Sequence, residues 1–91
     1  MKIRFRQDAE YELHEALEWY EACAKGLGAQ FLRALDDCLD GIRQFPQAHP
    51  IVRGQARRAL LRQFPYSLAF RIEVDSILII SCRHFRQRPT Q

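Results

Sequence analysis

The sequence has little of what membrane-spanning, secreted and metal-binding proteins require. No apolar run approaches the roughly 20 residues of a membrane-spanning helix. The chain starts with alternating charged and apolar side chains, unlike a secretory leader, MKIRFRQD. Its three cysteines, Cys23, Cys38 and Cys82, include no CxxC pair, which argues against a disulfide framework and a metal site. We therefore expect a soluble, cytoplasmic protein whose cysteines are small buried hydrophobic residues.

Several enzyme motifs are also missing. The sequence has no Gly-rich phosphate loop, no GxSxG and no HExxH, so nothing supports nucleotide hydrolysis, serine hydrolysis or zinc proteolysis. His14 and His49 lie far from His84 and show no ligand spacing. We expect no metal and no cofactor. The 91 residues suffice for one domain with one modest core, residues 1–91.

Charge is distributed unevenly along the chain. Residues 1–50 hold six basic side chains against nine acidic ones, whereas residues 51–91 hold eight basic ones against Glu73 and Asp75. Every basic residue of the second half is arginine, whose planar guanidinium pairs bidentately with phosphate or carboxylate. An anionic polymer or an acidic protein is the expected partner of this half, and an ordinary solvated face is the alternative.

The first half predicts a short strand and two helices. Ile3 and Phe5 alternate with basic residues, as in a strand. Asp8 is the expected N-cap of a helix that runs to about Lys25, because apolar residues then recur at helical spacing. Gly26-Leu27-Gly28 predicts the turn to a second helix, which ends before Pro46. Helices joined so closely pack antiparallel and can cover one face of a sheet.

The second half predicts a sheet. Residues 46–57 are expected to form a connection rich in Pro and Gly, followed by strands at 58–64, 66–73 and 77–84. Strict alternation in the middle strand directs Tyr66, Leu68, Phe70 and Ile72 to the helices. The continuous apolar start of the last strand predicts a central position with both faces covered. The expected class is α+β, with the order beta-alpha-alpha-beta-beta-beta and a helical hairpin on one face of a small, largely antiparallel sheet.

Arginines are the candidate target-binding residues. Arg58 and Arg62 are expected to share one strand face, and Arg71 points away from the apolar side of its strand. If these side chains lie opposite the helices, they form a positive surface that Arg83 extends and that Arg86 and Arg88 continue into the tail.

His84 is the best candidate acid or base, because it is the only histidine in the basic half. Packing or a backbone hydrogen bond is the more ordinary role for a histidine that ends a strand. Tyr66 is the other group able to move a proton, although its alternation with Leu68 and Phe70 favours the core. Arginine cannot replace them, because it does not give up its proton in proteins.

Trp19 and Tyr20 form an aromatic pair near the end of the first helix. Packing in the core or at its edge is the ordinary expectation, and an exposed pair would instead serve as an anchor for a partner helix.

Motifs along nearly the whole chain resemble those of the RelE/ParE toxin superfamily. Residues 9–28 followed by Phe31-Leu32, and Phe45-Pro46 with Pro50, are similar to its helical hairpin and the segment after it. Residues 58–66 are similar to its second strand and turn, and residues 84–89 to its closing His-x-x-x-Arg-Pro signature. This signature and the Phe64-Pro65-Tyr66 turn are closer to the ParE, or plasmid stabilisation, branch. Many relatives continue with an aromatic residue where this sequence has Thr90-Gln91.

The resemblance implies the toxin of a type II toxin–antitoxin system, neutralised by a cognate acidic antitoxin whose flexible segment folds over it, in a heterotetramer or larger complex. A ParE-like member would inhibit DNA gyrase without being an enzyme, with Trp19 and Tyr20 as candidate antitoxin contacts. The alternative is a RelE-like endoribonuclease that cuts mRNA on the ribosome, with His84 catalytic and Arg62, Arg71 and Arg83 stabilising the phosphorane. A non-toxic nucleic-acid-binding module is the third hypothesis.

Overall fold

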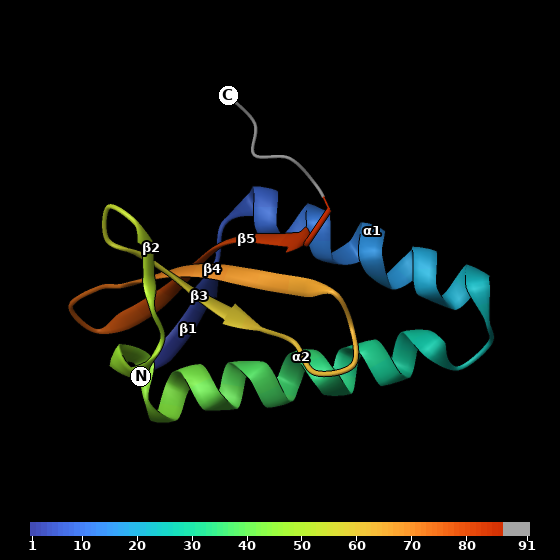
Figure 1. Cartoon of the computed structure of the whole chain (residues 1–91), viewed down its shortest axis with the longest axis horizontal. Coiled ribbons are helices and arrows are strands. Elements are labelled where there is room, and N and C mark those ends of the chain that lie inside the picture. The colour runs from blue at the N-terminus through green and yellow to red at the C-terminus, as the bar shows by residue number, and fades with distance from the viewer. Residues whose placement is uncertain (87–91) are drawn as a thin grey trace.

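Two helices pack with a five-stranded sheet, one beneath its strands and the other running on from the edge strand alongside its neighbour (Figure 1). The computed structural model describes residues 1–86. In chain order its elements are β1 (Lys2–Phe5), α1 (Gln7–Cys23), α2 (Leu27–Gln44), the 3-10 helix η1 (Pro46–Ala48), β2 (Ile51–Arg53), β3 (Ala56–Leu60), β4 (Tyr66–Ile72) and β5 (Ser76–His84). The predicted α+β class is confirmed, and the order contains one strand, β2, that the sequence did not predict.

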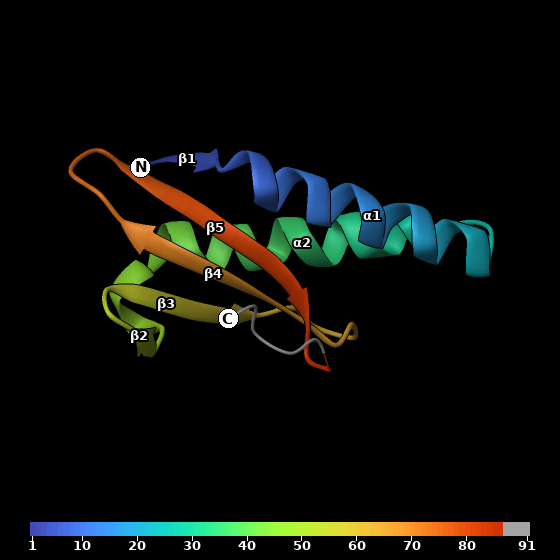
Figure 2. The same cartoon turned by 90° about the horizontal axis from the view of Figure 1, so that it is seen from above.

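The sheet is antiparallel except at one edge. Its strand order is β1-β5-β4-β3-β2, and only β1 pairs in parallel, with β5. The last strand is therefore an interior strand, as its apolar start predicts, but the helices cover only one of its faces and not both, contrary to the expectation. Seen from above, α2 runs behind the strands and α1 continues outward from β1 (Figure 2). The other face of the sheet, which we call the open face, carries no helix of the described chain.

The start of α1 differs from the expectation. Arg6 is the N-cap residue and makes no side-chain capping hydrogen bond, so the expected N-cap at Asp8 is wrong. Asp8 instead lies in the first turn of the helix together with Glu10. Negative charge there is stabilised by the exposed N–H groups of the helix end.

A carboxylate organises the junction between the helices. Gly26 has a φ of 89°, which glycine adopts without strain. The Glu21 carboxylate accepts hydrogen bonds from the backbone N–H groups of Gly26 at 3.1 Å and Gly28 at 2.9 Å. A Cβ at Gly28 would lie 2.8 Å from Glu21 Oε1, so a side chain at this position would displace the capping carboxylate. The predicted turn at Gly26 is confirmed.

An aromatic cluster joins the helices to the sheet. Phe31 of α2 is fully buried, and its ring lies 5.3 Å from Tyr20, 5.2 Å from Phe64 and 5.4 Å from Tyr66, measured between centroids. Leu68 and Phe70 are fully buried on the same side of β4, as their alternation predicts. The core therefore lies between the helical hairpin and this face of the sheet.

The segment between α2 and β4 was predicted least well. Residues 46–57 were expected to be a connection, but they hold η1, β2 and the start of β3. The strand expected at 58–64 instead ends at Leu60, because the chain turns at Gln63, whose φ is 70°. Leu61 and Phe64 are nevertheless buried, so the apolar pattern there reflects a packed turn and not a longer strand.

The cysteines are not all buried, contrary to the expectation. Cys82 is buried, Cys38 is half-buried and Cys23 is exposed. Burial raises the pKa of the Cys38 thiol to about 11 and that of the Cys82 thiol to about 12.

We expect a thiol-specific reagent to label only Cys23 rapidly in the folded protein at pH 8. A thiol with a pKa of 11 is ionised to roughly one part in a thousand at that pH, and the thiolate is the reactive form. Absorbance with an aromatic disulfide reagent would measure this, with the protein in 6 M guanidinium chloride as the control in which all three thiols react. Rapid labelling of a second thiol in the folded protein would contradict the buried placement.

Candidate functional site

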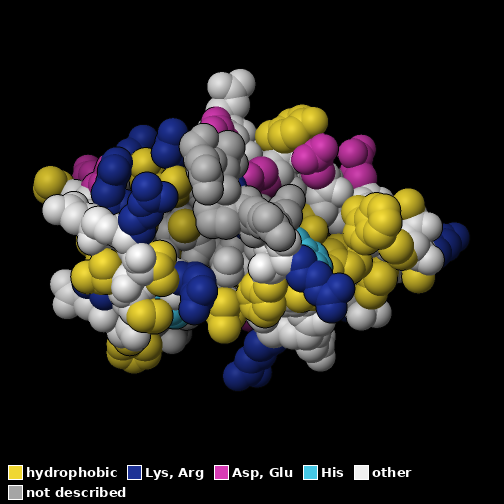
Figure 3. All heavy atoms as spheres, turned by 45° about the horizontal axis from the view of Figure 1, so that its top comes forward, with side chains coloured by type: hydrophobic (Ala, Val, Ile, Leu, Met, Phe, Trp, Pro, Cys, Tyr) yellow, Lys and Arg dark blue, Asp and Glu magenta, His cyan; other side chains and the backbone are white. Residues whose placement is uncertain are grey.

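Arginines project from the open face of the sheet. Residues paired across strands have side chains on the same face, and the face of Leu68 and Phe70 meets the helices. The opposite face carries Arg58 through its pairing with Ala69, Arg83 through Ser67, and Arg71 and Arg4 through Leu78. Figure 3 looks toward this face, and several Lys and Arg side chains gather in the left half of the view. The structure thus places three of the predicted target-binding residues, Arg58, Arg71 and Arg83, on one face of the sheet.

Glu73 joins two of these arginines. Its carboxylate lies 2.6 Å from Arg4 Nη2 and 2.9 Å from Arg71 Nη2. Hydrogen bonds from Arg71, and then from Arg4, lower the pKa of Glu73 below its usual value. Glu73 is therefore charged at neutral pH and holds the two guanidinium groups at one end of the open face.

Glu12 joins α1 to β5 at the other end. Its Oε1 accepts a hydrogen bond from the backbone N–H of Cys82 at 2.9 Å, and its Oε2 lies 3.4 Å from Arg83 Nε. β1 pairs with β5 only as far as Ile79, and Cys82 lies beyond that segment. The Glu12 carboxylate thus satisfies a backbone donor at the exposed edge of β5. No sequence pattern predicts this contact.

Arg62 does not belong to this surface, contrary to the expectation. It follows the end of β3 and lines a hollow beside α2, with Asp37, Cys38 and Gly41. The strand ends two residues before it, so strand alternation no longer places its side chain. Arg57 also points to the helix side, where its Nη1 donates to the carbonyl oxygens of His49 at 2.7 Å and Gln47 at 3.2 Å.

Of the two predicted tail arginines, Arg86 and Arg88, the structure describes only Arg86. Arg86 is exposed, and its backbone N–H donates to His84 Nδ1 at 3.0 Å. Arg88 lies outside the described residues.

His84 lies on the helix side of β5, away from the open-face arginines. It pairs with Tyr66, and the two ring centroids are 5.2 Å apart in an edge-to-face arrangement. Tyr66 in turn contacts Tyr20 and Phe31 of the core, and burial raises its pKa. The two candidate proton-moving groups therefore lie together, but on the side of the sheet opposite Arg58, Arg71 and Arg83.

Trp19 and Tyr20 have different environments. Tyr20 packs in the aromatic cluster, as its helical spacing predicts, whereas Trp19 is 65% exposed, so the core placement is wrong for it. Trp19 lines a hollow of about 290 Å³ between α1 and the ends of β4 and β5, together with Glu12, Glu15, Ala16, Tyr66 and Cys82. An exposed tryptophan beside such a hollow is suited to contact with a protein partner.

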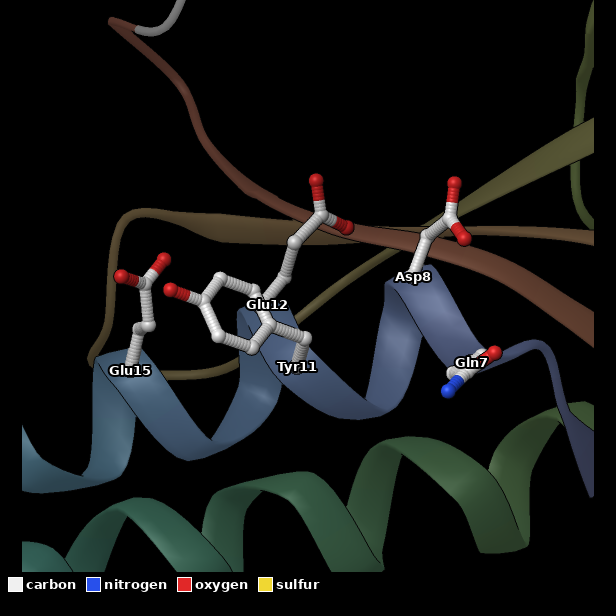
Figure 4. Close-up of a pocket in the computed structure, with 5 residues that line it drawn as sticks. All are labelled: Gln7, Asp8, Tyr11, Glu12 and Glu15. Carbon is white, nitrogen blue, oxygen red and sulfur yellow. The ribbon is translucent and has the colours of Figure 1, made fainter.

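Acidic side chains line the first turns of α1 (Figure 4). Asp8 and Glu12 point toward the sheet, whereas Gln7 lies away from them. The hydroxyl of Tyr11 points toward Glu15, and this hydrogen bond, with the negative charge of Glu15, raises the pKa of Tyr11. The open face is thus bordered on one side by carboxylates.

Residues 1–86 offer neither a metal site nor a membrane-spanning helix. No group of three or more His, Cys, Asp and Glu side chains there is arranged to hold a metal ion. Neither α1 nor α2 is long and apolar enough to cross a bilayer.

Comparison with known proteins identifies the fold. No protein-family model matches the sequence, and no curated protein matches it either. Among solved structures, the chain is similar to one described as "Chromosomal ParDE TA system from P. aeruginosa", with a TM-score of 0.66 over 92% of this chain and 95% of that chain. This chain has a RelE/ParE-like fold. The sequence identity is 19%, so the likeness concerns the RelE/ParE-like fold and not the residues of the open face.

Proposed function

We propose that this protein is a toxin of the ParE type, which inhibits DNA gyrase in the cytoplasm and is neutralised by an acidic antitoxin. The observation that carries the proposal is the separation of charge from acid–base groups. Arg58, Arg71 and Arg83 project from the open face, whereas His84 lies on the helix side. A surface that binds a target without cleaving it needs these arginines but no acid or base beside them.

Cleavage of RNA makes a further demand that this arrangement does not meet. Attack by a 2′-hydroxyl requires a base within hydrogen-bond reach of that proton and cations around the same phosphate. His84 Nδ1 already accepts a hydrogen bond from the Arg86 backbone, and the His84 ring packs on Tyr66. The geometry therefore favours inhibition by binding.

The uneven charge supports an acidic partner. The open-face arginines attract a segment of opposite charge, and the exposed Trp19 adds an apolar anchor beside β5. A domain of this size gains stability from a partner that binds only its folded form. The ParDE assembly named for the similar structure is a precedent for such a pair.

Replacement of His84 by Ala should leave growth inhibition unchanged. The native chain and His84→Ala would be expressed from an inducible promoter, with DNA breaks and mRNA integrity measured in parallel. We expect DNA breaks and intact mRNA in both cases, and His14→Ala, an exposed change on α1, is the matched control. Cleaved mRNA that disappears in His84→Ala would identify a ribonuclease instead, and harmless expression of the native chain would exclude a toxin.

A further inference from the structure

A cleft crosses the open face between β2 and the start of α1. Its volume is about 390 Å³, and it receives residues from β2, β3, β4, β5 and α1. The lining residues are Arg6, Asp8, Glu12, Val52, Arg53, Ala56, Ala69, Ile80, Ser81 and Arg83. We call it the open-face cleft.

Small side chains make the floor of the open-face cleft. Ala56, Ala69 and Ser81 lie on β3, β4 and β5, and Ala69 pairs directly with Ser81. Alanine and serine leave the backbone of the sheet accessible, whereas the neighbouring positions on this face carry Arg58 and Arg71. A ligand side chain can therefore enter between the arginines and contact the strands.

A bulge adds an apolar group to this floor. Ala69 pairs with Ser81 and Phe70 with Ile79, so Ile80 is an extra residue in β5. Such bulges redirect a side chain and are common beside binding sites. Ile80 is half-buried and lines the cleft, with Val52 of β2 also in its lining.

The charges of the cleft differ between its two ends. At the β2 end Arg53 is exposed and forms no ion pair within residues 1–86. At the α1 end the exposed Arg6 also lines the cleft, but two carboxylates lie there too: Glu12 is paired with Arg83, and Asp8 points toward the sheet. A phosphodiester chain that crossed the cleft would bring repeated negative charge against these two carboxylates. A protein segment can place one carboxylate at Arg53 and an apolar side chain on the floor.

We propose that the open-face cleft binds an extended protein segment in which an apolar side chain, seated over Ala69, adjoins an acidic one that pairs with Arg53. The natural segment rests on the proposed function, since it would belong to the antitoxin. Glu12 lines both this cleft and the hollow beside Trp19, so one segment can occupy the two in succession. It would cover the open-face arginines and thereby prevent contact with the target.

Fluorescein-labelled peptides test the proposal on the full chain. The probe is a twelve-residue peptide of alternating Leu and Glu, compared by fluorescence anisotropy with Ala–Glu and Leu–Lys peptides and with a twelve-nucleotide oligouridylate. We expect the Leu–Glu peptide to bind most tightly. Arg53→Glu should weaken it by about tenfold or more, because the change removes one well-placed charge pair and sets a like charge against the peptide. Ala69→Trp should weaken it by filling the floor of the cleft.

Two controls keep the outcomes distinct. Arg43→Glu changes an exposed arginine of α2 by the same charge and should not alter binding, and thermal unfolding should show that all variants fold. Peptide binding that is insensitive to Arg53→Glu and Ala69→Trp would overturn the proposal, as would tighter, Arg53-dependent binding of oligouridylate. Because the assay measures binding alone, its failure is separate from a failure of the native chain to inhibit growth.

Discussion

Replacement of Phe31 by Ala should lower the free energy of unfolding by about 3–5 kcal/mol, the usual cost of removing a buried phenylalanine. Phe31 is fully buried and contacts three other aromatic rings, from α1, the turn after β3, and β4. Removing its ring leaves a cavity where both helices meet the sheet. Because small domains have total stabilities of about 5–15 kcal/mol, the variant should be partly unfolded at 37 °C.

Urea denaturation followed by circular dichroism would measure this effect. Phe45→Ala is the matched control, because it removes the same side chain from a position that is 67% exposed. Its expected cost is below about 1 kcal/mol, as for most exposed substitutions. Equal losses in the two variants would show that the aromatic cluster is not the centre of the core.

Growth inhibition should be lost when Arg58 and Arg71 are both replaced by Ala. Each guanidinium that contacts an anionic group of the target should contribute about tenfold in affinity, so the double change should cost about a hundredfold. Stability should hardly change, because Arg58 is exposed and the ion pair of Arg71 with Glu73 is on the surface. The dissociation constant for purified gyrase and the inducer dose that halves growth are the two measurements.

The control for this prediction removes the same charge from the opposite layer. Arg33 and Arg43 are exposed on α2, and their double replacement by Ala should preserve both binding and growth inhibition. If this pair abolished inhibition and the open-face pair did not, the target would bind the helical hairpin. That result would change only the assignment of the binding face. The RelE/ParE-like fold does not depend on which face binds the target.

Strong alternation and helical spacing made most of the fold predictable. In β4 every second residue is apolar from Tyr66 to Ile72, which determines both the strand and the face that meets the helices. The strand β2 carries no such signal, since its three residues are all exposed and Pro50 and Gly54 flank it. Its existence depends on pairing with β3, which a local pattern does not report.

The candidate site was predictable only where it depended on alternation. Alternation along β4 correctly predicted the face from which Arg71 projects. The predicted position of Arg62 was wrong, because Gln63, with a left-handed backbone conformation, ends the extended segment. The link from Glu12 to Cys82 and Arg83 was not predictable, because it spans about 70 residues and depends on how α1 packs along β5. Arg53 was missed for a similar reason, since its strand was not foreseen.

The position of β5 between β1 and β4 has a consequence for synthesis in the cell. Ile3 pairs with Ile77. The sheet is therefore complete only when a strand translated near the start of synthesis pairs with a strand translated near its end. Until β5 has left the ribosome, β1 and β4 each lack the neighbour that buries them, and proteins rich in such distant pairings fold late. A nascent chain interrupted before this strand would therefore be a substrate for proteases and not an active protein.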